Sequence, residues 1–358
     1  KALVRESDVL GRRGDDEFLI LLSELERGDL PEVRTPEDWA RACNQMSTLV
    51  SNRILAALAP PYSVQNQKLH VTASIGASVS LDAETAEEFI EHAETAMVAA
   101  KEAGRNNLQF YTADLKQRRQ RKLSFDGQLR EALENDEFTL LYQPIVHLSS
   151  GRLAGAEALL RWKHPEMNRL LAPEEFLSIA EETGLIVPIG TWALMQACRQ
   201  AALWRDEGLE IFTAVNMSTR QLMQADLPKT LTKALEVTNI DPKMLILDII
   251  EGSSLVDPER IDQNLEELTR QGVAIAIDDF GVGFSSLKRL GKVKMLKFHQ
   301  SLVQDVNSRH GSSICVAMLG ICSTLAVRSV AEGVETAEQA TFFLDKGCEL
   351  AQGFYFSE

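Results

Sequence analysis

The chain has 358 residues, of which 45% are hydrophobic and 25% charged, and its formal net charge is −15 at pH 7. This composition is typical of a folded, water-soluble protein with room for two or three domains, and the acidic excess disfavours nonspecific binding to nucleic-acid phosphates. The longest apolar stretch, residues 314–327, falls short of the roughly 20 residues that cross a bilayer. We therefore expect a buried helix there, and membrane attachment only through upstream segments.

The first third of the chain predicts one strand, one helix and a helical linker. Residues 69–80, LHVTASIGASVS, alternate and are β-branched, as in a strand, and residues 83–103 form an acidic helical run before Gly104. The basic run KQRRQRK at 116–122 leads into a second helical pattern that ends near Glu134. We interpret the run as a solvated linker in preference to a partner-binding patch. Five cysteines without a CxxC pair favour a reducing cytoplasm.

The remainder predicts a TIM-type barrel, because short apolar runs alternate with amphipathic helices. The first two runs are separated only by residues 148–151, too few for a crossover helix, so they should form an antiparallel hairpin. The predicted strands are 138–146, 154–160, 211–215, 244–249, 273–277, 294–298, 327–331 and 348–352.

Acidic and amide residues stand at the ends of these predicted strands. In a barrel the carboxyl ends of the strands meet at one mouth, where barrel enzymes place their active sites. Carboxylates at that density need hard divalent cations with oxygen ligands, and a pair of cations suits phosphodiester hydrolysis. Singly, each residue is more often a helix cap or a surface charge. The residues are Glu157, Asn216, Asp248, Asp278, Asp279, Lys297, Glu332 and Glu335.

The motifs around these residues resemble the EAL family of cyclic-di-GMP phosphodiesterases, from about residue 123 to the end. They are, in the order of that family, YQPI at 142–145, EALLRW at 157–162, VNMS at 215–218, DDFG at 278–281, AEGVET at 331–336 and QGF at 352–354. The resemblance implies an α/β fold with a TIM-type (βα)8 barrel and an antiparallel first strand. It also implies hydrolysis of cyclic di-GMP to linear pGpG with Mg²⁺ or Mn²⁺, and a homodimer through this domain.

By the same resemblance, the metal ligands are Glu157, Asn216, Asp248, Asp278, Asp279 and Glu332. The residues that contact the dinucleotide are Gln143, Arg161 and Gln352, although Arg161 has the alternative of a salt bridge on the barrel rim. The catalytic group comprises Lys297 beside the attacking water, Glu335, and Glu251 as the anchor of the loop 280–286.

Two departures from the family pattern keep a second function open. Asp248 stands where the family usually has glutamate, and the segment from Leu287 to Lys297 is two residues shorter than usual. His299 replaces an aspartate and is either a metal ligand or, as we prefer, a hydrogen-bonded barrel histidine. The alternative is a receptor that binds cyclic di-GMP without cutting it and signals to a protein partner.

The beginning of the chain resembles the C-terminal part of a GGDEF domain, an α+β fold found in diguanylate cyclases. Residues 13–18, RGDDEF, match its hairpin with Asp15 in place of the second glycine, and Arg5 and Asp8 match its RxxD inhibitory site. The bulk and charge of Asp15 beside a triphosphate exclude cyclase activity. The domain then either binds a regulatory nucleotide or, as we prefer, serves packing. The predicted organisation is 1–112 GGDEF, 113–122 linker and 123–358 EAL.

Overall fold

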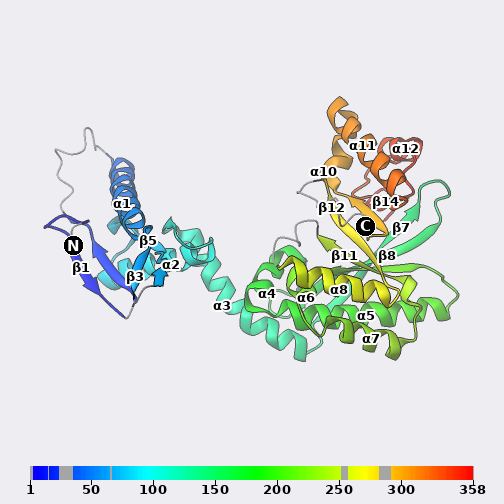
Figure 1. Cartoon of the computed structure of the whole chain (residues 1–358), viewed down its shortest axis with the longest axis horizontal. Helices are drawn as coiled ribbons and strands as arrows, with labels where there is room; N and C mark the ends of the chain where they lie inside the picture. The colour runs from blue at the N-terminus through cyan, green and yellow to red at the C-terminus, as the bar shows by residue number, and fades with distance from the viewer. Residues whose placement is uncertain are drawn as a thin grey trace. The chain divides into compact units, whose positions relative to one another are not determined.

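The computed structural model describes residues 3–14, 16–23, 35–64, 67–250, 257–281 and 292–357. The chain divides into two compact units, Lys1–Ser124 and Phe125–Glu358 (Figure 1). The division falls within α3 (Ala113–Glu134), which runs through the basic segment, so the narrower linker boundaries remain a prediction. Among the described helices, none combines the length and the apolar character that a bilayer span requires.

The first unit contains short strands and two long helices. In the antiparallel hairpin of β1 (Val9–Arg12) and β2 (Phe18–Leu21), the Arg13 amide donates to the Glu17 carbonyl at 3.0 Å between the two strands. β5 (Ile75–Ala77) and β6 (Leu108–Phe110) pair in parallel, with α2 (Ala86–Glu102) between them in sequence. The other elements are α1 (Pro36–Leu58), the hairpin of β3 (Tyr62–Val64) and β4 (Gln67–Leu69), and the short 3-10 turn η1 (Ser80–Asp82).

The predicted strand at 69–80 is shorter in the structure, whereas the predicted helix is confirmed. Thr85 caps α2 by accepting a hydrogen bond from the Glu88 amide, and Gly104 follows the helix with a positive φ of 96°. At Gly76 a Cβ atom would lie 2.0 Å from the Met97 amide nitrogen. Only glycine lets α2 approach β5 this closely. Within 69–80, strand pairing is limited to Leu69, at the end of β4, and to Ile75–Ala77 in β5.

The second unit is a closed barrel, as predicted. β7 is antiparallel to both of its neighbours, β8 and β15, and all other neighbouring strands of the barrel are parallel. The short β9 (Arg169–Leu171), which was not predicted, pairs with the far end of β8. In order around the barrel, the strands are β7 (Phe138–His147), β8 (Leu153–His164), β10 (Phe212–Met217), β11 (Leu245–Ile250), β12 (Ala274–Phe280), β13 (Met295–Phe298), β14 (Arg328–Ala331) and β15 (Leu350–Ala351).

Helices cover the outside of the barrel (Figure 1). They are α4 (Leu177–Thr183), α5 (Ile186–Asp206), α6 (Thr219–Leu222), α7 (Leu227–Thr238), α8 (Pro258–Arg270), α10 (Gln300–Gln304), α11 (Arg309–Leu325) and α12 (Ala337–Asp345), with 3-10 turns η2 (Pro173–Glu175), η3 (Pro242–Met244) and η5 (Asp305–Asn307). α11 contains most of the apolar stretch expected to be a buried helix. It buries one face, including Cys315 and Cys322, while Val316 is 45% exposed, so it is a half-buried covering helix.

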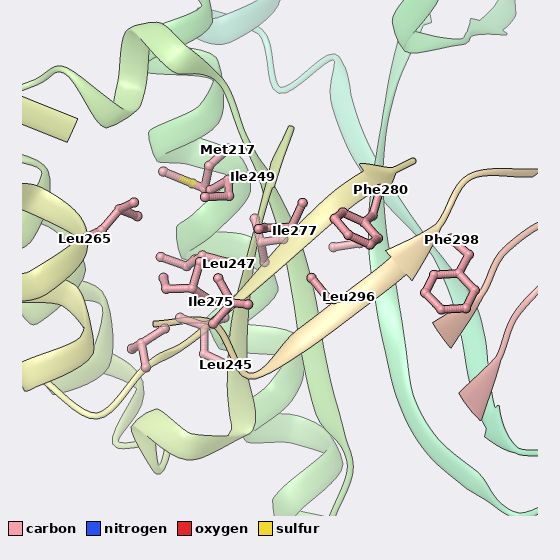
Figure 2. Packing of buried hydrophobic residues seen from close by; sticks show 14 of the residues in the cluster. Met217, Leu245, Leu247, Ile249, Leu265, Ile275, Ile277, Phe280, Leu296 and Phe298 are labelled. Carbon is pink, nitrogen blue, oxygen red and sulfur yellow. The ribbon is translucent and has the colours of Figure 1, made fainter. Parts of the chain in front are cut away.

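Alternation along the strands separates two hydrophobic layers. On β11, Leu245, Leu247 and Ile249 point outward to the helices, beside Ile275 and Ile277 of β12 (Figure 2). The intervening Ile246 belongs to an apolar cluster that forms the floor of the barrel interior. Because side chains in a strand alternate between its faces, the next inward residue after Ile246 is Asp248. The floor consists of Ile145, Phe212, Ala214, Ile246, Ala276, Met295, Val330 and Leu350.

Candidate metal and substrate site

A layer of polar side chains lies directly above the apolar floor, and every barrel strand contributes one of them. Each stands two residues from a floor residue on the same strand or its immediate extension, as Asp248 does from Ile246 and Lys297 from Met295. On β8, Gly155 takes the floor position because a Cβ there would lie 2.3 Å from the Phe212 ring. The layer consists of Gln143, Glu157, Asn216, Asp248, Asp278, Lys297, Glu332 and Gln352.

Lys297 is the centre of this layer, and its side chain is 0% exposed. Its Nζ lies 2.8 Å from Glu157 Oε2 and 2.9 Å from Asp248 Oδ2. The same nitrogen lies 2.7 Å from Glu332 Oε1 and 3.5 Å from Asp278 Oδ1. The carboxylates of Glu157, Asp248, Asp278 and Glu332 therefore surround one ammonium group. We call these four residues and Lys297 the cage, and its formal charge is negative.

Two amide side chains orient the carboxylates of the cage. Asn216 Nδ2 donates to Glu157 Oε1 at 2.7 Å. Gln352 Nε2 donates to Glu157 Oε2 at 2.8 Å and lies 3.3 Å from Glu332 Oε1 and 3.4 Å from Gln143 Oε1. Both oxygens of Glu157 thus have fixed donors, and this carboxylate is held in one orientation.

The pKa directions follow from burial and the uneven distribution of partners. Burial raises the pKa of Asp248 to about 7, and the charges of Glu157 and Asp278 add to this effect, which Lys297 offsets only in part. The pKa of Glu332 is raised well above its usual value, first by burial. Burial also acts on Glu157, but Lys297 and the amide donors outweigh it and lower its pKa. Burial alone would lower the pKa of Lys297, yet the surrounding carboxylates raise it.

The cage has the ligand chemistry of a divalent cation site. Two groups of carboxylates each bring their oxygens within 4.8 Å of one another, Glu157–Asp248–Asp278 and Asp278–Asp279–Glu332, and Asp278 belongs to both. Asp248 Oδ1 is buried and has no hydrogen-bond partner among the described residues. A buried carboxylate oxygen without a partner is costly, and hard cations such as Mg²⁺ or Mn²⁺ bind such oxygens. The residues present therefore fit such ions.

Asp279 and His299 lie at the more exposed side of the cage. Asp279 adopts a positive φ of 57° where the pairing of β12 with β13 is irregular, and its side chain is 45% exposed. His299 Nε2 lies 3.7 Å from Asp279 Oδ1. His299 Nδ1 lies 2.8 Å from Ser301 Oγ and accepts from the Ser301 amide at 3.2 Å, which caps α10. The hydrogen-bonded role that we preferred for His299 agrees with this geometry.

Two other residues of the second unit that were singled out in the sequence, Arg161 and Glu335, make no hydrogen bond or ion pair with the described cage residues. Arg161 is half-buried in the C-terminal part of β8, and its Nη1 donates to the Leu160 carbonyl at 2.8 Å. Glu335 is exposed before α12. In the first unit, the Arg5 amide donates to Asp8 Oδ2 at 2.8 Å. Glu251, Asp15 and loop residues 282–286 lie outside the described residues.

Sequence reasoning missed the apolar floor and the close approach of Phe212 to Gly155. The signal was present, because the inward positions of the strands alternate with a period of two and an apolar residue precedes most of the polar ones. The interaction of Trp162 Nε1 with Glu137 Oε2, at 3.0 Å, was also missed. Nothing in the sequence pattern indicates it.

Comparisons with known proteins match both parts of the chain. The family model for the EAL domain matches residues 126–358, and that for "Diguanylate cyclase, GGDEF domain" matches residues 1–107. The bifunctional diguanylate cyclase/cyclic di-GMP phosphodiesterase MucR of Pseudomonas aeruginosa is 36% identical over 99% of this chain and 50% of its own length. The cyclic di-GMP phosphodiesterase PdeR of Escherichia coli is 32% identical over 99% and 51%. The chain thus spans about half the length of these curated relatives.

Two solved structures are similar to this chain over about two thirds of its length. The PaMucR phosphodiesterase in complex with c-di-GMP is 40% identical with a TM-score of 0.62, covering 64% of this chain and 94% of that one. The EAL enzyme Bd1971, with cAMP and cyclic di-GMP bound, is 29% identical with a TM-score of 0.63, covering 66% of each chain.

Proposed function

The chain belongs to the EAL domain family, with part of a GGDEF domain before the EAL domain, and from this we propose that it hydrolyses cyclic di-GMP to linear pGpG. The observation that carries the proposal is the buried cage, in which carboxylates from several strands exceed the single ammonium of Lys297 and Asp248 Oδ1 has no partner among the described residues. Such a cage is costly unless cations complete it.

The cation ligands in this proposal are Glu157, Asn216, Asp248, Asp278, Asp279 and Glu332. Bound Mg²⁺ or Mn²⁺ would supply Lewis-acid activation of a water and charge stabilisation at a phosphodiester. Lys297 holds Glu157, Asp248 and Glu332 in place through contacts of 2.7–2.9 Å, and in this proposal its ammonium would orient that water. Gln352 and Asn216 fix the direction of Glu157.

Recognition of the dinucleotide falls to Gln143, Arg161 and Gln352. Arg161 has a forked guanidinium that suits a phosphate, and it forms no ion pair within the described ranges. We place Glu335 and Glu251 in supporting catalytic roles, and the homodimer at the EAL domain. The relatives MucR and PdeR carry cyclic di-GMP phosphodiesterase in their names, which supports the choice of substrate.

The partial GGDEF domain is inactive as a cyclase in this proposal, because Asp15 replaces a glycine of its motif. We keep packing as the preferred role of this domain. Its alternative role, binding a regulatory nucleotide, would fall to Arg5 and Asp8, where the Arg5 amide donates to Asp8 Oδ2 at 2.8 Å. The protein would act in the cytoplasm, or at the cytoplasmic side of a membrane if upstream segments anchor it.

A receptor that binds cyclic di-GMP without hydrolysis is the second candidate, and one observation favours it. Asp248 has a shorter side chain than the family's glutamate, and its Oδ2 contacts Lys297 at 2.9 Å. In this arrangement one oxygen of the carboxylate, Oδ2, is held by Lys297, and burial raises the pKa of Asp248 to about 7. Both features weaken it as a ligand, whereas binding through Arg161 does not require it.

Incubation of the protein with cyclic di-GMP and Mn²⁺, followed by chromatographic separation of the products, tests the proposal. Hydrolysis predicts pGpG from the wild type and none from Glu157→Ala. Binding of cyclic di-GMP without any pGpG at saturating Mn²⁺ would establish the receptor function instead. Absence of both binding and turnover would contradict both candidates.

A further inference from the structure

The C-terminal part of β8, beyond Glu157, places Arg161 and Trp162 on opposite faces of the strand. Past Glu157, β8 pairs with β7 on one side, where Thr139 is opposite Arg161, and with β9 on the other, where Leu171 is opposite Trp162. Side chains alternate along a strand, so Arg161 shares its face with Glu157 while Trp162 points the other way. The position of Arg161 therefore depends on what supports this strand from behind.

Trp162 fills that supporting position completely. It is 0% exposed, and its ring makes edge-on contacts with Phe125 at 5.3 Å and Phe176 at 5.7 Å between ring centroids. Phe138 lies 6.1 Å away and His164 4.5 Å away. The indole Nε1 donates to Glu137 Oε2 at 3.0 Å. Because aromatic rings contact the indole on several sides and its Nε1–H has a hydrogen-bond acceptor, the Trp162 side chain is held in one orientation.

The C-terminal half of α3 forms the wall behind Trp162. Phe125, Leu129 and Ala132 lie on one face of this helix at helical spacing and are 7%, 0% and 0% exposed. After the helix, the Glu137 amide donates to the Ala132 carbonyl at 3.1 Å, and the Lys163 amide donates to the Glu137 carbonyl at 2.8 Å. The end of α3 is thus hydrogen-bonded to the same part of β8 that carries Arg161.

We infer that Phe125 and Trp162 are positioning residues for Arg161, so that the packing of α3 against β8 determines the affinity for the cyclic dinucleotide. The inference rests on the proposed function, in which Arg161 contacts a phosphate. Phe125 does not touch the cage, and its effect passes through Trp162 and the strand. Because α3 also leads from the GGDEF unit into the barrel, a shift of this helix would change substrate affinity while leaving the cation ligands in place.

A double-mutant cycle between Phe125 and Arg161 tests this coupling. Calorimetry in metal-free buffer measures the dissociation constant of cyclic di-GMP for wild type, Phe125→Ala, Arg161→Ala and the double variant. We expect Phe125→Ala to weaken binding about tenfold, within the coupling usual for residues in one network, and to have no further effect once Arg161 is alanine. Phe125→Leu, which keeps most of the volume, should restore most of the affinity and serves if the alanine variant does not fold.

Leu231→Ala is the matched control, because Leu231 is a fully buried α7 residue in the outer layer, away from Arg161. It should lower the unfolding temperature as Phe125→Ala does, with unchanged cyclic-di-GMP affinity. Mn²⁺ affinity, measured by electron paramagnetic resonance, should be the same in wild type and Phe125→Ala. Equal losses of dinucleotide affinity in Phe125→Ala and Leu231→Ala, or an undiminished effect of Phe125→Ala in the Arg161→Ala background, would overturn the inference. If Arg161→Ala itself leaves the affinity for cyclic di-GMP unchanged, the proposed contact of Arg161 with a phosphate is wrong, and the inference that rests on it is wrong as well.

Discussion

Replacing Asp248 with glutamate lengthens this side chain by one C–C bond, about 1.5 Å, at a position that is only 1% exposed. Metal–oxygen distances in working sites hold to about ±0.2 Å, so the change in reach is several times the tolerance. Asp248 Oδ2 lies 2.9 Å from Lys297 Nζ, and Oδ1 has no partner among the described residues. A glutamate cannot extend straight toward Lys297 without a clash. It should turn to the side of the unpartnered oxygen, where the cation ligands Glu157 and Asp278 converge.

We expect Asp248→Glu to tighten Mg²⁺ binding about tenfold, at the lower end of effects seen when metal-site partners change, and to raise hydrolysis at limiting Mg²⁺. Added volume in the packed cage should cost about 1–3 kcal/mol of stability without metal. The assay is the initial rate of pGpG formation against Mg²⁺ concentration, with calorimetry of cyclic-di-GMP binding in metal-free buffer, where little change is expected. Asp345→Glu, at an exposed position, adds the same methylene as a control and should change neither.

An identical Mg²⁺ dependence in wild type and Asp248→Glu would refute the argument from reach. If both proteins bind cyclic di-GMP but neither turns it over at saturating Mn²⁺, the receptor function is correct. The shortened segment before Lys297 would then be the cause of the lost catalysis.

Four further predictions concern the cage and the substrate contact. Glu157→Ala should abolish hydrolysis with the fold intact by circular dichroism, because a ligand and not core volume is removed; residual turnover at the wild-type rate would exclude Glu157 as a ligand. Arg161→Lys should weaken cyclic-di-GMP binding in calorimetry, since a point charge cannot replace the bidentate fork, and an equal dissociation constant would place Arg161 on the rim. Lys297→Met should destabilise the metal-free protein by about 3–5 kcal/mol in denaturant unfolding, because it leaves buried carboxylates without their cation, and added Mn²⁺ should recover much of this loss; equal stability of the two metal-free proteins would contradict the charge balance. The pKa of Asp248 is raised to about 7 from 3.8, so the folded metal-free protein holds this proton more tightly than the unfolded chain does. The contribution of Asp248 to stability should therefore fall as the pH rises from about 4 to about 7, while Mn²⁺ affinity rises and Mn²⁺ binding releases protons. Calorimetry in buffers of different ionisation enthalpy would detect these protons, and none released at pH 6 would count against the raised pKa.

The sequence by itself predicted the barrel and its first antiparallel pair. Period-two alternation and short apolar runs are local properties, and the four residues 148–151 leave no room for a crossover helix before β8. The same logic placed polar residues such as Asp248 and Lys297 at strand ends. The rule that strand ends share one mouth then brought them to a single site, which the structure confirms for the cage.

Contacts between distant segments were decided only by the tertiary structure. Glu157 and Lys297 are 140 residues apart in sequence and 2.8 Å apart in space, and their separation depends on how the barrel closes. The exposed position of Glu335, the half-exposed face of α11 and the packing of Phe125 against Trp162 follow in the same way from contacts between elements. A local pattern specifies which face a side chain occupies, whereas closure of the barrel and docking of the helices specify what that side chain meets.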